Sequence, residues 1–344
     1  MNLDSLYFEV KANIDRVRFD ELWQGFAPFK FAIYDAEKCF FNGSFMKKPA
    51  TFVANTSVLY EGEYIAIWHV MEPMNPTVLA TKIIHEMFHA FQNVRGGTRF
   101  PNELEALSKY RYDEVNLSLK YEENKILLDL MEDFNLEAYS DFLAYRSSRR
   151  EKFPYEFCYE ASVEEVEGAA QYVELNALKQ LSGELYAKSL ERLKKRVLVA
   201  EDIFPVRVRC YDVGAILFQV LIDNHLLEFE EHTNVLSADR LLEGIQESNI
   251  KTILNPGIIE GLNKYRSSTL EMIQKGINEG VLIEEGELEV LGVNFYNARY
   301  AEGNIISTYF VWYRKEGQEN LRYGDFLIQL DKQNNGSKIF QINI

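Results

Sequence analysis

Cysteine is scarce in this chain, which has Cys39, Cys158 and Cys210 in 344 residues. An odd number of distant cysteines without C-x-x-C spacing argues against a disulfide framework and for a reducing compartment. We expect each thiol to be a small buried apolar side chain. Long apolar runs are also missing, because the longest, residues 213–222, is too short to span a bilayer and contains Gln219. With no secretory signal at the start of the chain, we expect a soluble, cytoplasmic protein.

Positive charge is in deficit as well. The chain has 37 lysines and arginines against 53 aspartates and glutamates, which gives a formal net charge of -16. A surface of that sign repels nucleic acid and anionic membranes, so we expect neither as a partner. A neutral or basic substrate is easier to accommodate. The hydrophobic fraction of 47% is enough to fill a large core.

Histidine is rare, with five in the chain, yet His85 and His89 are separated by only four positions. Four residues of an α-helix advance by about 400°, so both imidazoles lie on one face and can bind one ion. Glu86 follows the first histidine, where its carboxylate can take a proton from metal-bound water as a general base. The alternative is a chance match to the His-Glu-x-x-His pattern on a structural helix.

The residues around this motif predict a helix of about five turns. Asn75 is a plausible N-cap and Pro76 suits the first helical position, whereas Gly96-Gly97 supplies the stop. Apolar residues recur at helical spacing between these ends and give the helix one apolar face. They are Leu79, Ile83, Ile84, Met87, Phe88 and Phe91.

A third ligand is sought in residues 162–174, which are rich in acids. Ser162 and Glu165 have capping-box spacing, so we expect a helix to begin here and to explain Glu165 structurally. Glu167 is left over, and the small residues after it let its helix approach another closely. Glu164 is the next candidate, and the alternative is that all these acids lie on a solvated face. Two histidines, one glutamate and a position left for water form a known catalytic zinc set.

The motif of His85, Glu86 and His89, taken with Glu167, Gly168, Tyr172 and Glu174, resembles the gluzincin zinc peptidases. This broad group contains thermolysin and aminopeptidase N. The resemblance covers roughly residues 60–225 and is specific at these clusters. It implies a zincin-like fold, Zn2+ held by His85, His89 and Glu167, and Glu86 as the general base.

Tyr211 lies in a Tyr-x-x-Gly segment that resembles the one following the zinc glutamate in aminopeptidase-like members. The resemblance implies that its hydroxyl stabilises the oxyanion of the reaction. The alternative is a packing role, because the chain has 20 tyrosines. The long gap between His89 and Glu167 implies an inserted helical segment of roughly residues 102–150. The Gly-x-Met-Glu-Asn motif of the aminopeptidases is absent, so recognition of a free peptide N-terminus is not expected.

The pattern along the chain predicts an α+β fold. Residues 1–75 are sheet-rich and residues 76–280 mainly helical, and together they make one zincin-like metallopeptidase domain of residues 1–280. Residues 281–344 are expected to form a small antiparallel β module. The strand at residues 64–70, just before the motif helix, is a candidate edge that pairs with an extended peptide, although an ordinary core strand is the alternative.

These observations together predict a zinc-dependent hydrolase. The expected substrate is a peptide or protein, whose peptide bond is attacked by metal-activated water with Glu86 as base. Because a fold does not fix a function, the alternative is a catalytically silent zincin-fold protein with a binding or regulatory role.

Overall fold

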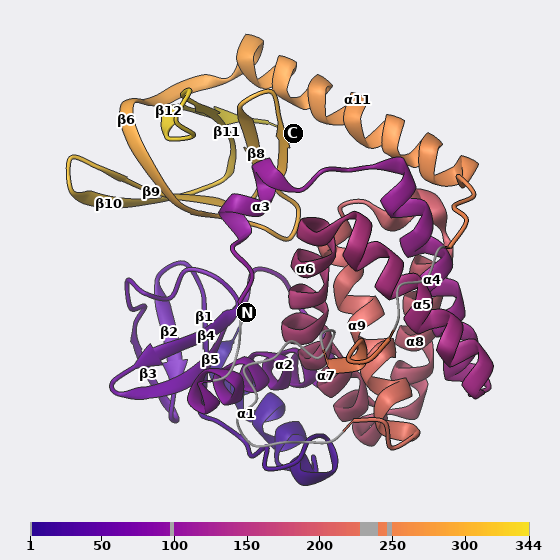
Figure 1. Cartoon of the computed structure of the whole chain (residues 1–344). Coiled ribbons are helices and arrows are strands. Elements are labelled where there is room, and N and C mark those ends of the chain that lie inside the picture. The colour runs from indigo at the N-terminus through magenta and orange to yellow at the C-terminus, as the bar shows by residue number, and fades with distance from the viewer. Residues whose placement is uncertain (1, 97–99, 228–239, 246–249, 344) are drawn as a thin grey trace.

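The fold combines two β-sheets with a helical region that lies between them in the chain (Figure 1). The computed structural model describes residues 2–96, 100–227, 240–245 and 250–343. A five-stranded mixed sheet precedes the helices, and a seven-stranded antiparallel sheet follows them. The predicted α+β class, with its small mixed sheet, its helices and its C-terminal antiparallel sheet, is therefore confirmed. Within the described ranges, no helix is both long and apolar enough to cross a bilayer.

The N-terminal sheet has the strand order β3-β2-β1-β5-β4, in which β1 and β5 are parallel and the other neighbours antiparallel. Helix α1 packs beside it, against β1 and β2 and against the motif helix. The elements are α1 (Leu3–Ile14), β1 (Phe31–Tyr34), β2 (Lys38–Phe41), β3 (Ser44–Lys47), β4 (Thr56–Tyr60) and β5 (Glu63–His69).

Strands β4 and β5 form the predicted hairpin. Glu61 and Gly62 at its tip have φ angles of 51° and 86°, as a two-residue turn between twisted antiparallel strands requires. Of the two alternatives for residues 64–70, the exposed edge is wrong and the ordinary core strand is confirmed, because β5 pairs with β1 on one side and β4 on the other. Strand β4 is the edge instead. An apolar run in the sequence indicates a buried strand, but it does not show which strands pair with it on either side.

The motif helix is α2 (Pro76–Arg95), and its predicted limits are confirmed. The side chain of Asn75 accepts hydrogen bonds from the backbone N–H groups of Thr77 and Val78, and Gly96 ends the helix at a φ of 67°. Gly97 lies outside the described residues. The predicted apolar face is buried, and α2 packs against β5, α1 and helix α7 (Ala169–Leu181).

A set of packed helices follows α2 and includes the predicted inserted segment. Its members are α3 (Glu103–Lys109), α4 (Glu114–Glu132), α5 (Leu136–Lys152), α6 (Pro154–Val163), the π-helical turn η2 (Glu164–Gly168), α7, α8 (Gly183–Leu198) and α9 (Val206–Asp223). The predicted helix start at Ser162 is wrong. The Ser162 hydroxyl donates to the Cys158 carbonyl within α6, and the chain stays helical through η2 into α7. A serine can bond back to the preceding turn as readily as it caps a new helix.

A balanced network of six charged side chains is buried between α4, α5, α6 and η2. Three cations face three carboxylates, and each carboxylate contacts two of the cations. The members are Lys120, Arg146, Arg149, Glu123, Glu160 and Glu164, and each is at most 2% exposed. Charges this deeply buried persist because they are paired. The network therefore ties the inserted helices to the segment that leads into η2.

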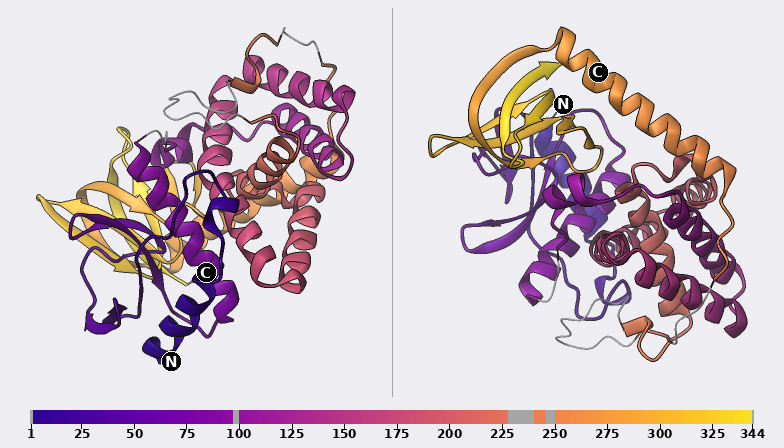
Figure 2. Two further views of the ribbon diagram at one scale, coloured as in Figure 1. Left: turned by 90° about the horizontal axis from the view of Figure 1, so that it is seen from below. Right: turned by 45° about the horizontal axis from the view of Figure 1, so that its top comes forward.

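The C-terminal sheet has the strand order β10-β9-β6-β12-β11-β8-β7. Helix α11 (Pro256–Glu279) packs on it through Ile273, and through Ile258 and Leu262 it also packs on the helical region. Figures 1 and 2 show α11 running from the helices to the sheet. The strands are β6 (Val281–Val293), β7 (Arg299–Ala301), β8 (Asn304–Ser307), β9 (Phe310–Lys315), β10 (Gln318–Tyr323), β11 (Asp325–Leu330) and β12 (Gly336–Ile342).

The two sheets touch each other. The Tyr323 hydroxyl donates to the Val53 carbonyl at 3.2 Å, and the Tyr309 hydroxyl lies 2.5 Å from Nδ1 of His69 at the end of β5. The C-terminal sheet is thereby held beside the strands that lead to α2, as both views of Figure 2 show.

The three cysteines are not joined by disulfides. Cys39 and Cys210 are buried, as expected of small apolar side chains, whereas Cys158 is exposed. The expectation of burial is therefore wrong for Cys158, because α6 turns that position outward.

Candidate metal centre

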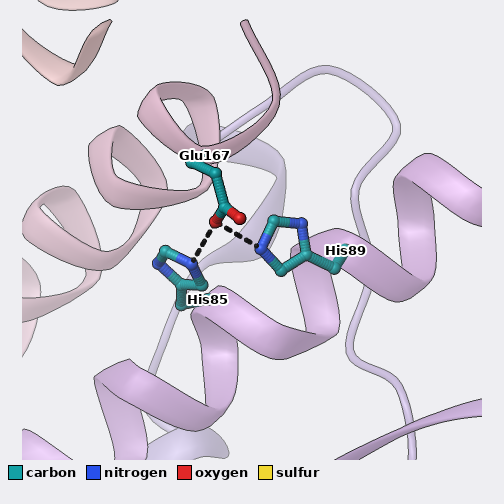
Figure 3. Close-up of side chains that lie close together, drawn as sticks. All are labelled: His85, His89 and Glu167. Carbon is teal, nitrogen blue, oxygen red and sulfur yellow. Dashed lines mark hydrogen bonds and ion pairs between the residues drawn. The ribbon is translucent and has the colours of Figure 1, made fainter. Parts of the chain in front are cut away.

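His85, His89 and Glu167 meet where η2 crosses α2 (Figure 3). Oε2 of Glu167 lies 3.5 Å from Nε2 of His85 and 3.1 Å from Nε2 of His89. The two histidines are nearly buried on one face of α2, as their spacing predicts. One ligand atom from each of the three residues lies within 4.8 Å of the other two.

These distances fit a tetrahedral zinc site. Nitrogen and carboxylate ligands about 2.0–2.2 Å from a tetrahedral zinc ion lie roughly 3.3 Å from one another. The two contacts of Glu167, 3.1 and 3.5 Å, fall on either side of that spacing. Two imidazoles and one carboxylate are a donor set that leaves a fourth position open, as catalytic zinc requires. The residues present therefore fit a zinc ion.

The π-helical turn η2 presents Glu167 to the histidines. Single π-helical turns inside α-helices often occur at functional sites. Gln92 joins this turn to α2, because its amide donates to the Val166 carbonyl at 3.0 Å while its Oε1 lies 2.7 Å from Nδ1 of His89. The remaining nitrogen of His89 is thereby oriented, as in many metal sites where the second ring nitrogen has a protein partner.

Glu164, the other candidate ligand, lies in the buried charge network rather than beside the histidines. It accepts hydrogen bonds from Lys120 at 2.9 Å and from Arg146 at 3.0 Å. Glu160, Glu164 and Cys210 also lie close enough to one another to hold a metal ion. The ammonium of Lys120, 2.8 and 2.9 Å from the two carboxylates, already supplies the positive charge there.

Glu174 is a second carboxylate at the site, about two helical turns after Glu167 on α7. Its Oε2 lies 3.2 Å from Nδ1 of His85, and its Oε1 accepts from Lys82 at 3.4 Å. This contact is an ion pair without hydrogen-bond geometry, so Glu174 acts on the imidazole as a neighbouring negative charge. The sequence contains this residue within the family-like cluster, but its spacing alone did not indicate its role.

Glu86 is nearly buried and lines the same cavity as the two histidines. Burial raises the pKa of its carboxyl, while His85 and His89 act in the opposite direction. A raised pKa makes the ionised carboxylate a stronger base, as the role of general base requires.

Tyr211 of α9 stacks on His85, with ring centroids 6.3 Å apart and an angle of 11° between the planes. Its hydroxyl oxygen accepts a hydrogen bond from Arg207 at 2.6 Å, so its own proton is directed elsewhere. Burial raises the pKa of Tyr211 well above its ordinary value, so the hydroxyl stays protonated and able to donate.

Arg207 is a residue that sequence reasoning missed. Besides Tyr211, its guanidinium donates to Glu167 at 3.0 Å and to Glu103 at 2.8 Å. The spacing of four residues between Arg207 and Tyr211 on one helix is a signal that could have identified the pair. No local pattern identified Glu103, because it lies on α3 in the inserted segment, far from Arg207 in the sequence.

The charges at this centre favour a cation. Four carboxylates, from Glu86, Glu103, Glu167 and Glu174, face two cations, Lys82 and Arg207, which leaves two negative charges. Burial alone would lower the pKa of His85, but its contacts with Glu167 and Glu174 raise it to about 10. A dication would balance the excess and would replace the proton that the imidazole of His85 otherwise takes up.

A cavity of about 1050 Å³ opens over these residues. Its walls include the edge strand β4 with residues 54–55 before it, helix α2, η2 with helix α7, Arg196 of α8, helix α9, and two loops of the C-terminal sheet at residues 294–297 and 308–310. All five residues predicted for the site line this cavity, so the structure brings them together. Comparison of the chain with protein-family models, with curated proteins and with solved structures found no match.

Proposed function

We propose that this chain is a zinc-dependent hydrolase of gluzincin type that cleaves peptide bonds. The observation that carries the proposal is the convergence of His85, His89 and Glu167, with Oε2 of Glu167 3.1 and 3.5 Å from the two imidazole nitrogens. Glu86 and Tyr211, two groups suited to proton transfer and hydrogen-bond donation, line the same cavity. A catalytic site needs all five side chains at one place. A chance motif on a structural helix would not require Glu167 and Tyr211 to lie beside it.

In this proposal His85, His89 and Glu167 hold the ion. A zinc ion bound there would lower the pKa of water towards about 7 and polarise the carbonyl group of the substrate. Glu86 takes a proton from the attacking water and later delivers it to the leaving amine. Tyr211 donates a hydrogen bond to the oxygen of the carbonyl as it becomes negative. Gln92 keeps the imidazole of His89 in the orientation that binding requires.

The edge of the N-terminal sheet supports a peptide as the substrate. Strand β4 pairs with β5 on one side only, and Thr56 and Ser57 at its start line the cavity beside the histidines. An edge strand offers unpaired backbone N–H and C=O groups, with which an extended peptide can pair. A peptide added to β4 would run across the metal centre.

The proposal is tested by incubating the zinc-loaded protein with a mixed peptide library and reading the products by mass spectrometry. We expect cleavage that stops when zinc is removed with a chelator and returns when zinc is added back. An uncleaved library, together with recovery of one stoichiometric partner protein, would instead favour a silent zincin-fold binding protein. The intact and nearly buried Glu86 is the feature that argues against that alternative.

A further inference from the structure

The cavity also contains two cations that the reaction described above does not use. Lys82 on α2 and Arg196 on α8 both line it, together with Tyr296 in the loop between β6 and β7. Their side chains reach solvent: 37% of the Lys82 side chain and 46% of the Arg196 side chain are exposed, and Tyr296 is 52% exposed. These three side chains are called the basic subsite below.

The basic subsite adjoins the metal centre. The ring of Tyr296 packs edge to face on Tyr211, with centroids 6.0 Å apart. Arg196 donates to Asp212, the residue after Tyr211, and Lys82 donates to Glu174, which lies beside His85. The three side chains therefore lie around one part of the cavity wall.

Arg196 shares its carboxylate partner with a second arginine. Its guanidinium forms a two-pronged contact with Asp212, at 2.8 and 2.5 Å. The same carboxylate also accepts from the buried Arg209 at 2.6 Å. Two guanidinium groups thus share the carboxylate of Asp212, and 46% of the Arg196 side chain stays exposed and open to a ligand.

Lys82 has donors to spare as well. Its ammonium contacts one oxygen of Glu174 at the long distance of 3.4 Å, and Glu174 is shared with His85. An ammonium group has three donors, and a partly exposed one can turn them towards a ligand. The exposed part of Lys82 and the exposed part of Arg196 face the same cavity.

We propose that Lys82, Arg196 and Tyr296 form a subsite for a carboxylate group of the peptide substrate. This inference rests on the proposed peptidase function and adds to it a class of substrate. Peptides have two kinds of carboxylate, the C-terminal one and those of aspartate and glutamate side chains, and the guanidinium fork and the ammonium group can bind either. Tyr296 adds a hydroxyl donor and an apolar ring against the backbone.

The position of the subsite sets where the carboxylate lies in the substrate. Lys82 precedes His85 by three residues, which is about 4.5 Å along a helix axis. An extended peptide advances about 3.3 Å per residue. The anion therefore lies roughly one to two residues from the bond that is cleaved.

The test compares matched peptides. One pair has the same sequence with a free C-terminal acid or a C-terminal amide two residues from the cleaved bond. The other pair is longer, amidated, and has glutamate or glutamine at that position. We expect kcat/KM to favour at least one charged peptide by about tenfold, the size of one charge-assisted hydrogen bond. In Arg196→Gln and in Lys82→Met this ratio should fall towards one.

Lys194→Met is a control on α8, the helix that carries Arg196. It removes a cation that pairs with Glu132 on the surface. It should keep the wild-type ratio. Preference for the acid over the amide would identify the C-terminal carboxylate as the ligand, and preference for glutamate over glutamine would identify a side chain. Equal values within both pairs would overturn the proposal.

Binding to Glu86→Gln separates the subsite from the reaction. Calorimetry with the same peptides, on zinc-loaded protein that does not turn them over, should show about tenfold tighter binding of the charged member. Discrimination in binding without hydrolysis by the wild-type protein would uphold the subsite and contradict the peptidase proposal. Hydrolysis without discrimination between the charged and uncharged peptides would contradict the subsite but not the peptidase proposal. Failure of every peptide to bind would also contradict the subsite.

Discussion

Gly168 of η2 lies directly against Gly214 of α9. A Cβ atom at Gly168 would lie 2.5 Å from the Cα of Gly214, and one at Gly214 would lie 2.5 Å from the Glu164 carbonyl oxygen. Only two glycines permit backbones to approach this closely. The contact holds the segment with Glu167 beside the helix with Tyr211, close enough for Arg207 to donate to both.

Replacing Gly168 should therefore disturb both stability and the site. Gly168→Ala forces the two backbones apart, and overpacking of this kind costs about 1–3 kcal/mol. We expect a lower midpoint of thermal unfolding and weaker zinc binding. Gly183→Ala is the control, because a Cβ there meets no atom within 4 Å. Equal stability of the two variants would show that η2 and α9 can separate without cost.

Glu86→Gln should retain zinc and lose hydrolysis. The amide keeps the size of the side chain but cannot take the proton of the attacking water, so kcat should fall by several orders of magnitude. Zinc content, measured on the same preparation, is the control that separates a lost base from a lost ion. Activity close to that of the wild type would remove Glu86 from the role of base.

Tyr211→Phe tests the oxyanion donor. Loss of the hydroxyl should lower kcat roughly 10²-fold or more and leave zinc content unchanged, as expected when one donor to a developing negative charge is removed. Tyr172→Phe is a matched control on α7, since Tyr172 packs in the core and does not line the cavity. A rate unchanged by Tyr211→Phe would return this residue to a packing role.

The buried charge network predicts how stability depends on pH. Burial alone would raise the pKa of Glu160, but Arg149 and Lys120 hold it at about 2, below the value of about 4.3 in an unfolded chain. A lowered pKa stabilises the fold at any pH above about 4.3, and this contribution is lost as pH falls through about 2.

Glu160→Gln should accordingly destabilise the protein by about 3 kcal/mol or more at pH 7, because it leaves buried cations without a partner. The difference from the wild type should shrink between pH 4 and pH 2, as the wild-type carboxyl takes up its proton. Denaturant unfolding at several pH values measures this. Glu184→Gln, on an exposed helix surface, is the control and should change little. A pH-independent difference would contradict the role of ionised Glu160.

The sequence predicted what local patterns determine. Asn75, Pro76 and Gly96 set the ends of α2 through their own backbone preferences, and the spacing of His85 and His89 put both on one face. Glu167 could be proposed because small residues follow it, although the first of them, Gly168, packs against α9. Such features need no knowledge of distant parts of the chain.

The features that the sequence did not predict depend on tertiary packing. Ser162 had the spacing of a cap, but the helix continued through it because its hydroxyl bonds back to Cys158. The sequence could not decide whether residues 64–70 form an edge or an inner strand, since the neighbouring β1 comes some thirty residues earlier. Glu103 and Arg207 meet across a separation of 104 residues, and no local pattern connects them.

The measurement that tests the proposed zinc centre most directly is the metal content of protein purified without chelator or a metal-affinity step. The wild type is compared with Glu167→Ala and with Glu165→Ala, a change in the same helical turn. We expect about one zinc ion per chain in the wild type and in Glu165→Ala. In Glu167→Ala, zinc binding should be lost or greatly weakened. A wild-type protein that binds no zinc even after zinc is added would contradict the metal centre and the hydrolase proposal with it. Zinc that persists in Glu167→Ala would contradict the assignment of the third ligand.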